Sequence, residues 1–459
     1  MAECSSRFLY LAGAHLIRKA GALNPDALGD LPLFTRQLLS SLVVPALLFT
    51  VTQNARADAP NAASVVSQYA DIAEANYSDA LSSAQKLQAA VDSLIAKPSD
   101  ATLKAARDAW VAARAPYQQT EAFRFGNPIV DDWEGKVNSW PLDEGLIDYV
   151  AGSYGSDNPE NELYVANVIA NEKLTYGGKE IDASKITAAL LSEELQEAGG
   201  VEANVATGYH AIEFLLWGQD LNGTGPGAGA RPATDYDVKN CTGGHCDRRA
   251  AYLKAVTDLL IEDLKWMVAQ WAKDGAARKA VVSAEGDGGV QAIFTGLGSL
   301  SYGELAGERI KLGLMLHDPE EEHDCFSDNT HNSHYYDVIG MRNVYLGEYA
   351  KLDGKTIKGP SVSDLVRTKS PEIDAEVRAA IENTVAKMGA LKKRAETVER
   401  YDQMIGQGNA EGNAVVQAAV DALIAQAKAF EKAIAALGIT AIQFEGSDSL
   451  DNPTTVGSP

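Results

Sequence analysis

Residues 250–272 read AAYLKAVTDLLIEDLKWMVAQWA, and the large apolar side chains of this stretch recur every three or four positions. The members of the repeat are Leu253, Val256, Leu260, Leu264, Met267 and Trp271. This spacing places them on one face of an α-helix, whereas a half-buried β-strand would alternate with a period of two. The stretch therefore predicts a long helix that buries one face.

The same period recurs through most of the chain, and convincing β-strand alternation is scarce. Helical spacing is found in residues 61–97, 103–117, 373–397 and 412–437. Pro98 ends the first of these helices, and Pro116 predicts a kink in the second. We therefore predict an all-α protein built from helical bundles.

A stretch rich in glycine and proline, residues 218–244, divides the chain near its middle. It predicts two helical halves, residues 58–240 and residues 241–440, joined by a long connection. The halves resemble each other weakly. Each has a helix of small residues with an internal arginine, Arg114 or Arg309, followed by an acidic irregular segment. We predict two related bundles that arose by duplication.

The N-terminal segment, residues 1–57, is typical of a leader that directs export. Residues 38–49 form a short apolar run after Arg36, and residues 55–57 read Ala-Arg-Ala. A positive residue, a short apolar run and a small-x-small site in this order describe a secretory signal peptide. The run is shorter than the roughly 20 apolar residues of a membrane span, and the alternative is a buried N-terminal helix. At the other end, we predict a disordered polar tail over residues 441–459.

The charge of the chain narrows its partners. It carries 63 acidic and 40 basic side chains among 459 residues, a net charge of −23. Nucleic acid and anionic lipid both need a basic surface, so this charge argues against them and favours cations. No second long apolar run follows the leader, so we expect no transmembrane span in the mature chain.

The cysteines also fit export. Cys241, Cys246 and Cys325 remain once the leader is removed. A short disulfide between Cys241 and Cys246 would suit an oxidising compartment. Cys325 would then be free or would exchange partners with the other two.

Chemically distinctive residues gather first in residues 208–218, GYHAIEFLLWG. His210 and Glu213 are three positions apart and so share one helix face. The helix around them is apolar on nearly every side, which predicts burial, and a buried carboxylate needs a partner or a cation. Imidazole and carboxylate at this spacing present metal ligands in helical bundles. The alternative is a buried His–Glu pair that links helices, because two residues cannot complete a metal shell.

A second group lies in residues 114–121, RAPYQQTE, and residues 140–144, WPLDE. Glu121 falls on the buried stripe of its helix, where its charge needs a partner. An internal salt bridge with Arg114 is one role for it, and Asp143 alone would more often cap a helix.

A third group lies in residues 323–334, HDCFSDNTHNSH, which hold three histidines and two aspartates in a chain with seven histidines. This density predicts a pocket for a metal ion or a small anion. Polar loops with a similar composition also remain solvated, so both interpretations stay open.

Together these stretches resemble the imelysin family. The motifs that carry the resemblance are GxHxxE at 208–213, RxPYxxTE at 114–121, WPLD at 140–143 and SDNTH at 327–331. The first motif is weak alone, but four motifs in this order are specific. The resemblance runs from about residue 61 to about residue 440. The family is catalogued as a peptidase family, M75, and includes an insulin-cleaving membrane protease and iron-regulated protein A.

The resemblance implies two related helical bundles with a site at their interface. It also implies export to the periplasm or association with the outer membrane, and expression tied to iron. A related domain of ferrous-iron transport proteins carries a His-x-x-Glu pair proposed to bind metal, so a membrane iron-transport component is a candidate partner. By motif position, the resemblance assigns metal binding to His210 and Glu213, and also to Glu121 and Asp143.

The residues and the resemblance meet in one hypothesis, in which one imidazole and three carboxylates hold a cation. The predicted ligands are His210, Glu213, Glu121 and Asp143. Such donors suit iron first, and also manganese or zinc, better than copper(I). The residues expected to line the site or orient its ligands are Arg114, Tyr117, Arg309, Ser327, Asn329, His331 and Asp337. The expected function is binding of a metal ion or metal chelate in an exported iron-acquisition system.

Two other functions stay open. A metal-dependent peptidase would need a water on the metal, a general base such as Glu144 or Asp337, and Arg309 as an oxyanion stabiliser. No zinc-peptidase motif or nucleophile constellation identifies catalytic residues. The third function is that of a helical interaction protein whose polar pocket is structural.

Overall fold

Two long helices with side-chain caps begin the described part of the chain. The computed structural model describes residues 61–440 and 442–456, so the predicted leader lies outside the described residues. Helix α1, Ala62–Ala96, begins after Asn61, whose side chain accepts a hydrogen bond from the Ser64 amide at 2.9 Å. Helix α2, Asp100–Gln118, begins after Ser99 with the same kind of capping box.

The stretch that indicates the fold forms helix α6, Cys246–Trp271, and the six apolar residues of its repeat are all buried. Two other predicted helices form as α12, Pro371–Thr397, and α14, Ala410–Leu437. The remaining helices are α3 Pro128–Val137, α4 Glu144–Ile147, α5 Gly208–Trp217, α7 Ala276–Val282, α8 Gly288–Ser299, α9 Leu312–Leu316, α10 Thr330–Leu346, α11 Val362–Lys369, α13 Tyr401–Ile405 and α15 Asp448–Asp451. The protein is all-α, as predicted.

Two short antiparallel hairpins decorate this helical framework. Strand β1, Lys173–Tyr176, pairs with β2, Lys179–Asp182, and β3, Glu348–Ala350, pairs with β4, Thr356–Lys358. We did not predict them, because strands of three or four residues are too short to establish an alternating pattern.

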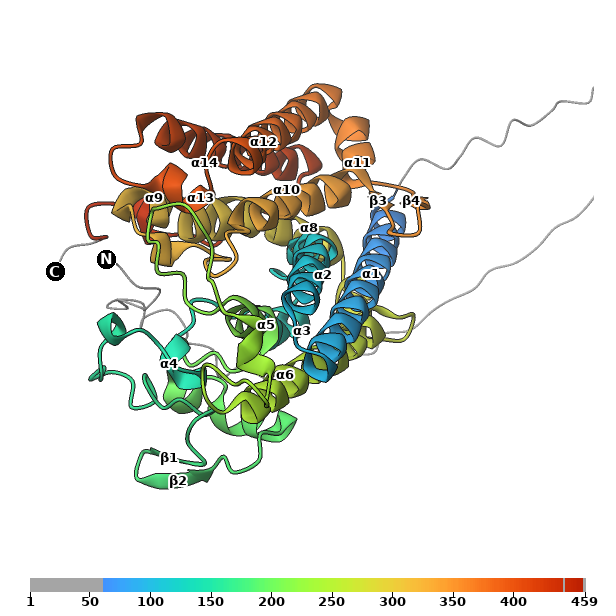
Figure 1. Cartoon of the computed structure of the whole chain (residues 1–459). Helices are drawn as coiled ribbons and strands as arrows, with labels where there is room; N and C mark the ends of the chain where they lie inside the picture. The colour runs from blue at the N-terminus through green and yellow to red at the C-terminus, as the bar shows by residue number, and fades with distance from the viewer. Residues whose placement is uncertain (1–60, 441, 457–459) are drawn as a thin grey trace, which may run out of the picture. The chain divides into compact units, whose positions relative to one another are not determined.

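The helices pack in two groups (Figure 1). Helices α1, α2, α5 and α6 form one group, and α10, α12 and α14 form the other with the π-helix η6, Leu300–Lys311. Helix α10 also packs on α2 and on the 3₁₀-helix η1, Gln119–Phe123, and so joins the groups. Helix α6 belongs to the predicted C-terminal half but packs on α1 and α5. The packing groups therefore do not follow the division at residue 240, and the duplication stays a prediction.

The helices that flank the junction of the groups are irregular. Pro116 lies inside α2, and the chain tightens into η1 two residues after the predicted kink. Helix α8 continues into η6, whose wider π-turns carry Arg309. Wide turns of this kind are frequent at functional sites.

The segment after residue 441 packs on the continuous helix of α8 and η6. That helix presents glycines on the contacting side: a Cβ at Gly298 would lie 2.1 Å from the Phe444 ring, and one at Gly307 would lie 2.2 Å from Ser447. The Ser449 hydroxyl donates a hydrogen bond to the Gly307 carbonyl at 3.0 Å. Within the tail that we predicted as polar and disordered, Phe444, Ser447 and Ser449 contact this helix, where its small residues leave room for them.

The structure joins Cys241 and Cys246 in a disulfide at the start of α6. Cys325 is not a free thiol. Of the helices within residues 61–440 and 442–456, none combines the length and the apolar character that crossing a membrane requires.

Candidate metal centre

Helix α5 carries the GxHxxE motif and is buried along its whole length. Gly208 starts the helix with a φ of +79°, and a Cβ there would lie 2.4 Å from the Val137 carbonyl oxygen. Only glycine tolerates both the left-handed backbone and this close approach. Because α5 also packs on α2 and α6, the directions of its side chains are fixed.

His210 and Glu213 are hydrogen-bonded to each other on α5. Nδ1 of His210 lies 2.9 Å from Oε2 of Glu213, and both side chains are at most 1% exposed. Nε2 of His210 is buried and has no hydrogen-bond partner among the described residues. An imidazole whose one nitrogen is held by a carboxylate commonly offers its other nitrogen to a metal ion.

The segment between the 3₁₀-turn η7, Pro319–Glu321, and α10 brings two further potential ligands, His323 and Asp324, to His210. One ligand atom from each of His210, His323 and Asp324 lies within 4.8 Å of the others. All three residues are at most 1% exposed. The two imidazole rings meet edge to face, with centroids 4.8 Å apart.

Glu213 fastens this segment to α5. Its Oε1 accepts hydrogen bonds from the Ser327 amide at 3.0 Å and from the Ser327 hydroxyl at 2.6 Å. Since Oε2 faces His210, both carboxylate oxygens are engaged. Glu213 therefore orients His210 and fixes the loop, and it is not a member of the group of three.

Asp324 is held by a positive charge and by neutral donors. The Arg114 guanidinium lies 3.0 Å from its Oδ1, and Asn329 and Ser333 donate to its Oδ2 at 2.8 and 2.5 Å. Arg114 itself lies over the ring of Tyr209, 5.0 Å from the centroid. A cation at this centre would share Asp324 with Arg114, whose charge opposes cation binding.

The environment sets the protonation of the four central groups. Burial lowers the pKa of His210 and of His323 well below the usual value, so both rings are neutral and able to ligate a metal. Burial alone would raise the pKa of Asp324, but Arg114 and His323 hold it well below its usual range. Burial, and then the charge of Asp324, raise the pKa of Glu213 well above its usual range.

Glu121 and Asp143, predicted as ligands, lie elsewhere. Glu121 Oε2 accepts a hydrogen bond from Arg309 at 2.7 Å, and Arg309 also pairs with Asp337 at 3.3 Å. These residues form a separate buried ion cluster on η1, η6 and α10. Asp143 precedes α4 and accepts a hydrogen bond from Asn161 at 2.7 Å. The predicted set of one imidazole and three carboxylates does not converge in this structure.

The predicted lining residues divide between the two places. Arg114 and Asn329 contact Asp324, and Ser327 contacts Glu213. Tyr117 packs against Arg114, whose guanidinium carbon lies 5.5 Å from the centroid of the tyrosine ring. Arg309 and Asp337 belong to the ion cluster. Nε2 of His331 lies within hydrogen-bond distance of the neighbouring Asn332 side-chain nitrogen, at 3.1 Å. His331 is not a member of the group of three.

His323 and Asp324 are the ligand candidates that the sequence did not single out. Residues 323–334 were noticed as a group, but no helical period relates residue 323 to His210. The only sequence signal was the density of histidine and aspartate, which does not say which of five residues converge.

The donors suit a first-row transition metal. Two imidazoles and one carboxylate that leave open positions are the donor set of many non-haem iron(II) sites, and zinc and manganese accept the same donors. The unpartnered Nε2 of His210 fits such an ion. Three protein donors would leave positions for water or for a chelating ligand.

Comparisons with known proteins give one family. The family model described as Imelysin, peptidase M75, matches residues 73–430. The curated Iron-regulated protein A of Synechococcus elongatus is 36% identical over 72 residues, which are 16% of this chain and 20% of that protein. The match thus spans about a fifth of that relative's length.

Two solved structures share the fold. A protein assigned as an iron-regulated protein A precursor from Parabacteroides distasonis ATCC 8503 aligns with a TM-score of 0.58 at 18% identity, over 82% of this chain and 95% of that one. An imelysin-like protein from Psychrobacter arcticum 273-4 aligns with a TM-score of 0.54 at 16% identity, over 82% and 96%. At such identities the likeness is one of fold.

Proposed function

This chain belongs to the imelysin family, and on that premise we propose that it binds a metal ion, with iron favoured, at His210, His323 and Asp324. One observation carries the proposal: three ligand atoms of suitable type, one each from His210, His323 and Asp324, lie within 4.8 Å of one another. His210 also has a buried Nε2 without a hydrogen-bond partner among the described residues. Glu213 acts behind His210 by fixing its ring.

Iron is favoured over zinc and manganese for two reasons. The donor set of two imidazoles and one carboxylate is typical of iron(II) sites, and a relative that is similar over 72 residues is named for its regulation by iron. The open positions of the centre would also accept a metal chelate. We further propose that the protein is exported to the periplasm, where it serves iron acquisition with a membrane iron-transport component.

Binding is favoured over peptide hydrolysis by the placement of the predicted bases. Asp337 pairs with Arg309 in the ion cluster, and neither residue is a member of the group of three. Glu144 lies at the start of α4, beside Asp143. A metallopeptidase would need such a base within reach of a metal-bound water.

The test of this function is the metal content of the full chain. The protein is purified without an affinity tag and is exposed separately to iron(II), manganese and zinc. We expect about one iron per chain in the wild type and none in folded His210→Ala and His323→Ala. The control is His245→Asn: His245 is exposed, lies outside the group, and has a φ of +49° that asparagine tolerates. Wild-type protein that stays empty under all three metals contradicts the proposal.

Cleavage of a denatured protein by the iron-loaded chain separates carrier from enzyme. We expect no cleavage above that of the His210→Ala variant. If cleavage requires both the metal and His210, the protein is a metal-dependent peptidase, and the proposal that it only binds metal is wrong.

A further inference from the structure

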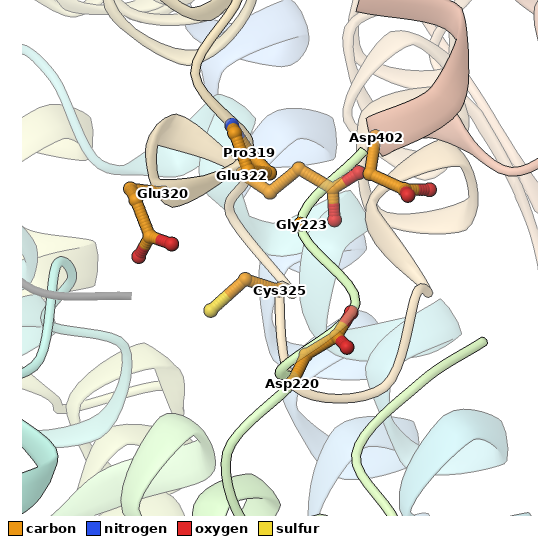
Figure 2. A pocket seen from close by; sticks show the side chains of 7 residues that line it. All are labelled: Asp220, Gly223, Pro319, Glu320, Glu322, Cys325 and Asp402. Carbon is orange, nitrogen blue, oxygen red and sulfur yellow. The ribbon is translucent and has the colours of Figure 1, made fainter. Parts of the chain in front are cut away.

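A second group of acids surrounds a small pocket apart from the histidines (Figure 2). Its walls come from Asp220 and Gly223 of the 218–244 stretch, from residues 319–325 and from Asp402 of α13. The pocket offers about 10 Å³ to a water-sized particle, about the room that one water or one ion needs. It therefore joins three segments that are distant in the sequence.

Two carboxylates of this pocket, Glu322 and Asp402, are buried and keep oxygens that have no hydrogen-bond partner among the described residues. Glu322 is 1% exposed, and its Oε1 has no hydrogen-bond partner among the described residues. Asp402 is 2% exposed, and neither of its oxygens has one. Figure 2 shows the Glu322 side chain extending toward Asp402, with both residues among those that line the pocket. Asp328 does not line the pocket, but it is 4% exposed, and its Oδ1 has no hydrogen-bond partner among the described residues. Such burial is costly unless a counter-charge is present.

The charges around the pocket are mostly negative. Burial, and then the charge of Asp328, raise the pKa of Asp402 to about 8. Burial, and then the charge of Asp220, raise the pKa of Asp328 to about 7, against the positive charge of Arg400. The charges that act most strongly on Glu322 are those of Asp402, Asp328 and Asp220.

We propose that Asp220, Glu322, Asp328 and Asp402 form a second cation site, which takes a hard divalent ion of the calcium and magnesium class. The donors are oxygens alone, which such ions prefer, whereas the centre at His210 has two imidazoles. The four acids do not meet the 4.8 Å spacing that the centre at His210 satisfies. The bound ion therefore keeps water among its ligands, as magnesium usually does and calcium often does.

This inference goes beyond the proposed function and does not rest on it, but it gives the ion a structural role. Glu322 Oε2 accepts a hydrogen bond from the Thr330 hydroxyl at 3.3 Å, and that hydroxyl accepts one from the Asp324 amide at 2.9 Å. An ion on Glu322 and Asp402 therefore fastens the segment that carries His323 and Asp324 to α13.

The test uses the full chain stripped by a chelator and titrated at neutral pH with calcium chloride, then with magnesium chloride. We expect one saturable site and a melting temperature that rises with ion concentration. Asp402→Asn should weaken the affinity by about 10-fold or more and remove the ion-dependent rise in melting temperature. Without the ion, the same variant should melt no lower than the wild type, because a repelling charge is gone.

Two variants keep the test decisive. Asp274→Asn is the matched control, since Asp274 is 92% exposed and should leave the ion effect unchanged. Asp328→Asn repeats the test if Asp402→Asn does not fold, because asparagine tolerates the φ of +53° at residue 328. His210→Ala should still bind calcium.

Two outcomes overturn the proposal. If neither ion binds and Asp402→Asn stabilises the protein equally with and without ions, the pocket holds protonated carboxyls in place of a cation. If His210→Ala also loses calcium, the two groups form one site and no second site exists.

Discussion

His210 Nδ1 lies 2.9 Å from Glu213 Oε2 within a single turn of α5, and this contact leaves the other ring nitrogen of His210 buried without a partner. Both residues belong to the GxHxxE motif, but they have different roles in this geometry. The histidine faces the centre, while the carboxylate faces the histidine and Ser327. The predictions below depend on that division of roles.

Glu213→Gln should weaken metal binding without abolishing it. The amide group places a donor either against His210 or against the two donors of Ser327, so the ring loses its fixed orientation. We expect an affinity about 10–100-fold lower at unchanged stoichiometry, measured by titration calorimetry. If folded Glu213→Gln is as empty as His210→Ala, then Glu213 is itself a ligand, as the sequence predicted.

Metal binding should release a proton. Burial and the charge of Asp324 raise the pKa of Glu213; below that pKa Glu213 holds one proton and neutral His210 holds a second. A metal on Nε2 leaves only the proton between Nδ1 and Glu213, so one proton departs. The affinity should rise by about tenfold per pH unit as pH increases below the pKa of Glu213. Calorimetry in buffers of different ionisation enthalpy measures the release, and a pH-independent affinity would contradict it.

Arg114→Met should destabilise the protein and strengthen cation binding. It removes the counter-charge of Asp324, which is fully buried, and loss of one partner of a buried pair costs about 3–5 kcal/mol. A metal should recover part of that loss, because Arg114 no longer competes for the carboxylate. Urea unfolding with and without metal measures both effects.

Arg107→Met is the matched control for this variant. Arg107 also lies over an aromatic ring, that of Trp217, but it donates to backbone carbonyls and has no carboxylate partner within residues 61–440 and 442–456. The loss of stability in Arg107→Met should be smaller than in Arg114→Met, and it should be the same with and without metal. Equal losses in the two variants would show that packing, and not the pair with Asp324, decides the result.

Glu121→Gln should lower stability and leave metal content unchanged. Glu121 accepts a 2.7 Å hydrogen bond from Arg309 in the ion cluster, and weakening that charged contact costs about 1–3 kcal/mol. Chemical denaturation gives the loss, and elemental analysis gives the metal content. A folded variant without metal would return Glu121 to the ligand set.

Gly208→Ala should lower the stability of the protein more than Gly178→Ala, a replacement that causes the same backbone strain without a steric collision. A Cβ at Gly208 collides with the Val137 carbonyl at 2.4 Å, whereas Gly178, with a φ of +74°, has no atom within 4 Å of its Cβ position. Backbone strain costs about 1–3 kcal/mol in both, and the collision adds to it only at Gly208. We expect lower metal affinity in Gly208→Ala alone. Equal melting temperatures would refute the steric argument.

The helices were predictable because their apolar period is long and unbroken. The repeat of residues 250–272 became α6 with every member buried, and Pro116, where we expected a kink, lies inside α2 shortly before η1. The π-turns of η6 were not predictable, because the sequence carries no local signal for them; η6 packs against α14 and against residues of the tail. The short hairpins escaped notice for lack of length.

The candidate centre was half predictable. His210 stood out because an imidazole and a carboxylate three positions apart in an apolar helix need a reason to be buried. Glu121 lies on the same kind of buried stripe, but its charge is met by Arg309 from a distant helix. His323 and Asp324 reach His210 only through the fold of an irregular segment, for which sequence offers no period to follow.

The glycines that line one side of α8 and η6 also set an order of assembly. The helix that carries Arg309 packs on one side against residues of the 442–456 segment. The ribosome makes that segment more than a hundred residues after Arg309. That helix therefore reaches its final surroundings only late in synthesis.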